Sequence, residues 1–266
     1  MVPARAVSSA VLRVLHGNRR AVQVGAARGA VHLDLAGFIV TVTGPGVPWM
    51  PNGIVVDRLD ESPCVGWDPI APPVWDPVPA PVAGGPEQVA ALGRWLSARV
   101  DVPGISLERA PEALVGRGRG LTPEGDDILA GAAVGLRALG PAAGLAGDTV
   151  DRMARSLCPA DVRARTGSLS ATLLELAAAG AAPEPVARLL ADEDREGALA
   201  DLRRLGASTG AAIAAGIALA ANQLGRGGSP PAVSSFVCSS SRSAIAALPR
   251  SMTGRISGTW WKSRVS

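Results

Sequence analysis

The pattern of hydrophobic residues changes once along this chain, and that change most constrains the fold. From about residue 20 to 57, short runs rich in Val and Ile alternate with Gly, Pro and Asn, which is typical of a small antiparallel sheet. From about residue 86 onward, apolar residues recur at helical spacing instead. The sequence therefore predicts an α+β fold, with a small antiparallel β-rich N-terminal part followed by a mostly helical C-terminal part.

The expected boundaries follow from composition. The segment 63–86 is rich in proline and carries Trp67 and Trp75, so it lacks too many N–H donors for a central strand and is expected to be a loop or strap with packed tryptophans. Beyond residue 225 the chain is rich in Ser and basic residues without periodicity, which is typical of a tail that does not fold. We expect three parts: a β-rich part with the strap at 1–85, a helical domain at 86–225, and a disordered tail at 226–266.

The helical part is expected to be closely packed. Ala and Gly fill many of its positions, and small residues let helix backbones approach one another. The periodicity predicts helices at residues 86–100, 106–114, 126–139, 147–157, 169–180, 183–191, 194–205 and 208–224.

The distribution of charge excludes several classes of partner. Six of the 26 Lys and Arg residues lie in 226–266, which has no Asp or Glu, so the folded part carries more acidic than basic residues and has no basic surface for nucleic acid. The long apolar runs near 128–146 and 208–224 are broken by Arg137 or are short and rich in Gly and Ala, which favours buried helices over membrane spans.

The scarcity of certain residues limits the chemistry. Lys262 in the tail is the only lysine, and His16 and His32 are the only histidines, so a Schiff base, a Ser-His-Asp triad and a multi-histidine metal site are hard to build. Three cysteines without CxxC spacing fit reduced thiols, and no secretory signal is evident. These features predict a cytoplasmic protein.

The strongest candidate site is the segment 116–127, GRGRGLTPEGDD. Gly116, Gly118 and Gly120 allow backbone angles that let successive N–H groups surround an anion. Thr122 is a suitable N-cap and Pro123 a suitable first helical residue, so a helix is expected to begin here with its positive dipole end toward the turn.

Two acidic residues follow this turn. Asp126 and Asp127 replace the Lys and Ser or Thr of a nucleotide-binding P-loop, so nucleoside triphosphate binding is not expected. Adjacent side chains on a helix point about 100° apart, so at most one of the two carboxylates is expected to line a pocket. The alternative is that both only complement the helix dipole, at about 0.3 to 1 kcal/mol each.

Two further turns carry hydroxyl groups at predicted helix starts. The first contains Arg165, Thr166 and Ser170, and the second contains Ser208, Thr209 and Gly210. Taken alone, each is better explained by ordinary helix capping. If the three turns converge, they form one polar pocket for an anion.

The string GRGRGLTPEGDDILAG, followed by RTGSLSATLL and GASTG, resembles the family catalogued as domain of unknown function 2877. This resemblance covers about residues 10–225. The family includes a subunit of oxamate carbamoyltransferase, an enzyme of allantoin breakdown in purine catabolism that interconverts oxalurate and phosphate with oxamate and carbamoyl phosphate.

The resemblance implies a transferase subunit with a small anionic substrate, a carboxylate or phosphate, and with partner subunits. It implies that Gly118, Gly120, Thr122 and Gly125 bind the anion, and that Asp126 or Asp127 orients the carbamoyl amine or holds a metal such as Mg²⁺. Glu124 stands where the family has Ser, so a carboxylate enters the anion turn. The alternative function is a non-catalytic metabolite-binding or scaffold protein that uses the same turn.

Overall fold

The computed structural model describes residues 4–15, 21–27, 29–59 and 73–226 of the 266-residue chain. The elements follow in chain order: β1 (Ala4–Ser8), α1 (Ser9–Leu15), β2 (Val22–Ala27), β3 (Ala30–Leu35), β4 (Phe38–Thr43), β5 (Gly53–Val56), β6 (Val74–Trp75), α2 (Pro86–Ser97), α3 (Ala110–Leu114), α4 (Glu124–Leu139), α5 (Gly147–Ser156), α6 (Val162–Arg165), α7 (Ser168–Ala178), α8 (Glu184–Ala191), α9 (Arg195–Arg203) and α10 (Thr209–Arg226). Strands precede helices, apart from the short α1, so the predicted α+β class is confirmed.

The strands form one sheet in the order β2-β3-β4-β5-β1-β6. The pairs β2–β3, β3–β4 and β1–β5 are antiparallel, while β4–β5 and β1–β6 are parallel. Alternate residues of the strands, Leu35 of β3, Val40 and Val42 of β4, and Ile54 and Val56 of β5, fill a core with Val7 and Val11 from the N-terminal segment. No strand was expected in the first 20 residues, but β1 lies between β5 and β6 in the sheet.

The described part of the proline-rich strap ends the sheet. Its residues Val74 and Trp75 form β6, a two-residue edge strand, which is where prolines are tolerated because one side of the strand needs no ladder hydrogen bonds. Trp75 packs edge-on against Trp49 with ring centroids 5.8 Å apart, in line with the expected packing role. Trp67 lies outside the described residues.

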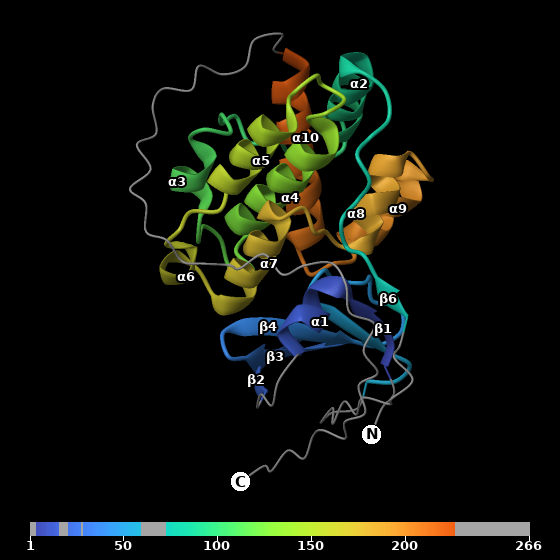
Figure 1. Ribbon diagram of the computed structural model, residues 1–266, viewed down its shortest axis with the longest axis vertical. Coiled ribbons are helices and arrows are strands. Elements are labelled where there is room, and N and C mark those ends of the chain that lie inside the picture. Colours follow the sequence, from blue (N-terminus) through green and yellow to red (C-terminus); the bar gives the residue numbers. More distant parts are fainter. Residues whose placement is uncertain (1–3, 16–20, 28, 60–72, 227–266) are drawn as a thin grey trace.

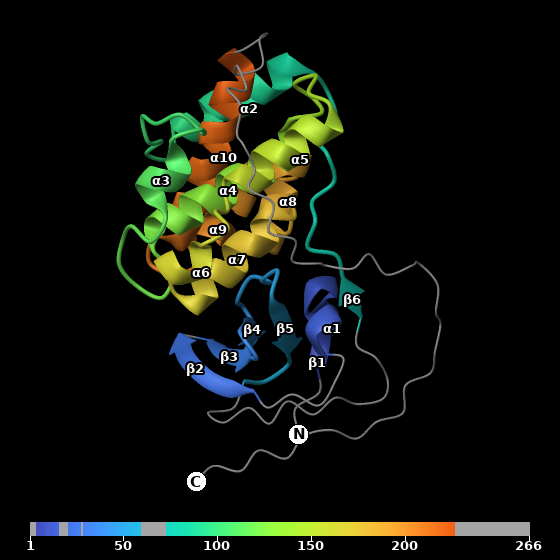
Figure 2. The ribbon, with the colours of Figure 1, turned by 60° about the vertical axis from the view of Figure 1, so that its left-hand side comes forward.

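The helical part is built around α4 and α10, which lie side by side in both views of the ribbon (Figures 1 and 2). Glycines make this approach possible: a Cβ added to Gly131 would lie 2.0 Å from the carbonyl oxygen of Ile213, and one on Gly216 would lie 2.0 Å from that of Ile128. The expected close packing through small residues is therefore confirmed at this helix pair.

The sheet lies at one end of the helical part (Figure 1). Buried Thr172 of α7 accepts a hydrogen bond from the amide of Ile39 in β4 at 3.3 Å. The amide of Glu184 donates to the carbonyl of Trp49 at 2.9 Å. These bonds dock the β4–β5 side of the sheet against α7 and α8, which positions the Met50–Pro51 loop beside the helices.

Most expected helices are present within a few residues of their predicted ends, and α1 and α6 are additions that the periodicity did not predict. Helix α4 begins at Glu124, with Pro123 rather than Thr122 as its N-cap. The predicted disordered tail lies almost entirely outside the described residues. No helix in the described ranges has the length and apolarity needed to cross a bilayer.

Candidate anion site at three helix N-termini

The glycine-rich turn connects α3 to α4 as an exposed loop. Gly116, Gly118 and Gly120 have φ of 71°, 124° and 99°, so they adopt the backbone angles that glycine was expected to allow here. At Gly118 space is also limiting, because an added Cβ would lie 2.6 Å from the amide nitrogen of Glu124.

Five successive backbone amides of this turn have no hydrogen-bond acceptor among the described residues. Within the described residues, no acceptor receives the N–H groups of Gly118, Arg119, Gly120, Leu121 and Thr122. These amides stand directly before the N-terminus of α4, so they and the helix dipole present partial positive charge at one place. The turn can therefore hold an anion at the surface.

Asp126 ties two of the turns together. One oxygen of its buried carboxylate accepts a hydrogen bond from the amide of Gly116 at 2.7 Å. The other accepts from the hydroxyl of Ser170 at 2.7 Å and from the hydroxyl of Thr166. Both oxygens are therefore engaged in holding the glycine-rich turn against the start of α7.

Asp127 is buried in a different environment. Only 3% of its surface is exposed, and its Oδ2 atom has no hydrogen-bond partner among the described residues. Burial raises the pKa of Asp127 to about 7, while hydrogen bonding from Thr209 and Thr122 acts against this rise. Near neutral pH this carboxyl therefore exists in both protonation states.

The hydroxyl groups of Thr122 and Thr209 lie 2.9 Å apart and hydrogen-bond each other. Thr209 is the first residue of α10, and Thr122 precedes α4 by two residues. Since Asp126 joins the same place to the start of α7, the N-termini of α4, α7 and α10 meet. The three turns identified in the sequence thus converge, and the carboxyl groups of Asp126 and Asp127 lie among three positive dipole ends.

Several expected contacts with a ligand have other partners in the structure. The amide of Gly125 donates to Arg117 and that of Gly210 to Leu205, so these two glycines serve close packing. An added Cβ would lie 2.1 Å from the carbonyl of Leu114 at Gly125 and 1.7 Å from that of Leu202 at Gly210.

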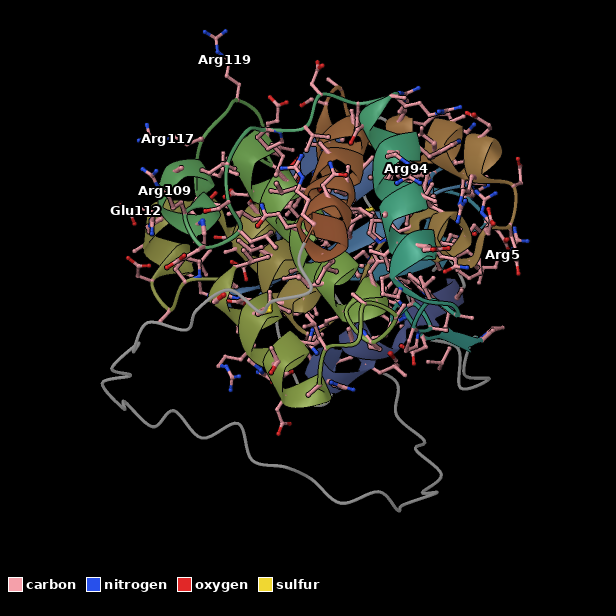
Figure 3. All side chains as sticks on the ribbon, turned by 90° about the horizontal axis from the view of Figure 1, so that it is seen from above. Arg5, Arg94, Arg109, Glu112, Arg117 and Arg119 are labelled. Carbon is pink, nitrogen blue, oxygen red and sulfur yellow. The ribbon has the colours of Figure 1, made fainter. Side chains whose placement is uncertain are left out.

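The arginines near the site point elsewhere. Arg165 donates to the carbonyls of Pro111 and Glu112 in the first turn of α3, at 3.4 Å each. Arg117 and Arg119, which lie within the glycine-rich turn, project outward into solvent (Figure 3). Ser208 is exposed beside Thr209, and no hydrogen bond of its side chain is found within the described residues. The positive potential of the site therefore comes from backbone amides and helix ends.

The segment from α3 to α10 has a recognisable relative. Residues 114–221 match the family of the oxamate carbamoyltransferase subunit AllH. The match covers all three turns but less than half of the chain, and it leaves out the sheet and α2. It supports the expected relation to that subunit and does not test the assignment to domain of unknown function 2877.

Neither of the other comparisons adds a relative. No curated protein and no solved structure matches the chain.

The sequence did not indicate that the sheet contributes to this region. Met50 and Pro51, from the loop before β5, line a cavity of about 20 Å³ together with Asp127 and Thr209. Such a volume holds about one water molecule. Its other walls are apolar, which explains why ionising Asp127 is costly.

The donor set does not fit a magnesium site. The oxygens of Asp126 are occupied by three hydrogen-bond donors, and Asp127 resists ionisation beside apolar side chains. Within the described ranges, no three His, Cys, Asp or Glu side chains are grouped closely enough to hold a metal ion.

Proposed function

We propose that this protein is a subunit of an oxamate carbamoyltransferase-like enzyme, which binds a small anionic substrate at the glycine-rich turn. The observation that carries the proposal is the meeting of three helix N-termini at a turn with free amides from Gly118 to Thr122. The match of residues 114–221 to the AllH family supports the choice of reaction. The proposal includes partner subunits, a cytoplasmic location and a role in allantoin breakdown.

In the proposed reaction, a phosphate oxygen attacks the carbamoyl carbon of oxalurate, and the bond from that carbon to the oxamate nitrogen breaks. Negative charge develops on the carbamoyl oxygen during the attack, and the free amides of the turn can stabilise it. The departing nitrogen needs a proton. A carboxyl group with a pKa near the working pH is suited to supply one.

Asp127 is our candidate for that proton donor. Its carboxyl is buried, but Thr209 and Thr122 hydrogen-bond with it and with each other, and both are half-buried. A proton can therefore pass from Asp127 to the turn through the two hydroxyls. Asp126 acts as a positioning residue in this proposal, because its hydrogen bonds fix the turn relative to α7.

The test is the phosphate-dependent breakdown of oxalurate by the protein purified with its partner subunits. We expect Asp127→Asn to lower kcat by about 100-fold or more, the range typical of a lost general acid. Asp148→Asn is the matched control, because Asp148 is exposed in the first turn of α5. Normal turnover by Asp127→Asn would refute the assigned role.

A binding measurement separates catalysis from simple recognition. Carbamoyl phosphate that binds only the folded protein should raise its melting temperature. Gly120→Val should reduce this effect, because a β-branched residue cannot keep the φ of 99° found at this position and the turn must change its conformation. Stabilisation without turnover, even with the partner subunits added, would instead identify a metabolite-binding protein. If carbamoyl phosphate neither stabilises the protein nor forms by turnover, the proposal of an anion site is refuted.

A further inference from the structure

A cavity distinct from the small one beside Asp127 borders the first turn of α4. It is a cleft of about 400 Å³, within the size range of small-molecule sites. The C-terminal end of α2 and the residues after it form one wall, and the starts of α4 and α10 with the end of α9 form the others. Its polar side chains come from Ser97, Arg99, Asp101, Glu124 and Arg203.

Two of these polar groups are already satisfied. The Arg99 guanidinium pairs with Glu196 at 2.5 Å and stacks on the Trp95 ring at 4.2 Å from its centroid. The Ser97 hydroxyl donates to Gly93 and accepts from Asn222. Both side chains shape the cleft and leave little capacity for a ligand.

Three charged side chains in the cleft can make further hydrogen bonds or ion pairs. Arg203 donates one hydrogen bond from Nη2 to the Arg99 carbonyl at 2.5 Å, and no other partner of its guanidinium is found in the described part of the chain. The carboxylates of Glu124 and Asp101 are exposed, without an ion pair or hydrogen bond to any described residue. The cleft thus offers one guanidinium group as a hydrogen-bond donor and two carboxylates as acceptors to the same ligand.

The remaining lining limits the size of that occupant. Val100, Ile128, Ala211, Ala212 and Ala215 supply only small or aliphatic side chains. An occupant with a short apolar body can contact them while its charged ends reach Arg203 and the two carboxylates. A purely anionic ligand would meet Glu124 and Asp101 unfavourably.

We propose that this cleft binds a small zwitterion of the amino-acid type, with its carboxylate on Arg203 and its ammonium group on Glu124 and Asp101. This site is separate from the anion site proposed at the glycine-rich turn. The proposal also assigns a role to Glu124. This acidic residue departs from the family pattern, and it lines the cleft. Binding here would touch the first turn of α4 and could therefore be sensed at the glycine-rich turn.

The test is an NMR titration of the full-length protein with L-alanine as the probe, compared with acetate and methylammonium. We expect concentration-dependent shifts of the backbone amides of Ala98, Val100 and Ala211, with L-alanine binding about ten-fold more tightly than either singly charged probe. Equal binding of acetate and L-alanine, or shifts confined to other parts of the molecule, would overturn the proposal.

Two variants locate the charges. Glu124→Gln and Arg203→Gln should each weaken L-alanine binding by about ten-fold, whereas Glu87→Gln, an exposed first-turn residue of α2, should leave it unchanged. Unchanged binding by both cleft variants would also refute the proposal. Oxalurate breakdown and carbamoyl phosphate binding are measured separately, so failure of this site leaves the proposed function standing, and the reverse also holds.

Discussion

Thr122 and Thr209 stand 87 positions apart in the sequence, yet their hydroxyl oxygens lie 2.9 Å apart at the starts of α4 and α10. The two helices present their N-termini at the same end, so their positive dipole ends repel each other. A hydrogen bond between the two threonines and the buried acidic pair beneath them hold this arrangement together. The electrostatics of the site therefore depend on contacts between distant segments.

The first prediction concerns this threonine pair. Thr209→Val removes the hydrogen bond that most lowers the pKa of Asp127, so that pKa should rise further above about 7. The shift can be followed by titrating the carboxyl carbon of Asp127 by ¹³C NMR. Ser208→Ala, an exposed neighbouring change, serves as the control and should leave the titration where it is. A lower pKa in Thr209→Val would contradict the assigned contact.

The second prediction follows from the burial of Asp127. Its pKa is raised from 3.8 unfolded to about 7 folded, so the folded chain binds more protons than the unfolded chain between these values. Its contribution to the free energy of unfolding is full below the unfolded pKa and is lost as the pH rises toward 7. In Asp127→Asn the side chain does not titrate, so this decrease in the free energy of unfolding with rising pH is absent.

Urea denaturation tests this dependence. Between about pH 4.5 and pH 8, Asp127→Asn should gain about 3 kcal/mol in free energy of unfolding relative to the unmodified protein. Asp148→Asn, which changes an exposed residue, controls for the altered net charge. Parallel pH profiles for Asp127→Asn and the unmodified protein would show that this carboxyl titrates normally.

Local sequence patterns were sufficient to predict most of the helices of the C-terminal part and the three turns. The glycines of 116–120 predict a turn because of their backbone freedom, and the hydroxyl groups near residues 166 and 209 predict helix starts because they can cap a helix. Both properties depend only on residues close together in the sequence. Helical geometry also limited how many of the adjacent Asp126 and Asp127 would face a pocket. The structure agrees, since the two carboxyls have different surroundings.

Other features depend on tertiary packing, which no short pattern encodes. The packing of α7 determines which of the two carboxylates has its hydrogen bonds satisfied. Ser170 of α7 donates to Asp126, although the two residues are 44 positions apart in the sequence. The Met50–Pro51 loop reaches Asp127 only because the sheet docks against α7 and α8. The N-terminal strand β1 was missed because its apolar run is short and needs β5 and β6 as partners.

The third prediction separates Asp126 from Asp127. Asp126→Asn leaves three buried or half-buried donors, on Gly116, Thr166 and Ser170, with fewer acceptor sites. We expect a loss of about 3 kcal/mol in free energy of unfolding and faster amide hydrogen exchange in the glycine-rich turn. Ser170→Ala, which removes one donor and leaves the carboxylate, should cost about 1 kcal/mol. Equal stability of Asp126→Asn and the unmodified protein would argue against a positioning role.

The last prediction tests the packing that brings the helix N-termini together. Gly131→Ala places a methyl group 2.0 Å from the carbonyl oxygen of Ile213, so α4 and α10 must move apart. We expect a loss of about 3 kcal/mol in free energy of unfolding, since the clash is with backbone and no rotamer change relieves it. Gly147→Ala is the matched control: an added Cβ meets nothing within 4 Å at the start of α5, so its effect should lie between zero and a gain of about 1 kcal/mol. Because separating the helices also breaks the contact between Thr122 and Thr209, Gly131→Ala should alter the Asp127 titration, while Gly147→Ala should not. An unchanged Asp127 titration in a destabilised Gly131→Ala protein would show that the site does not depend on the packing of α4 against α10.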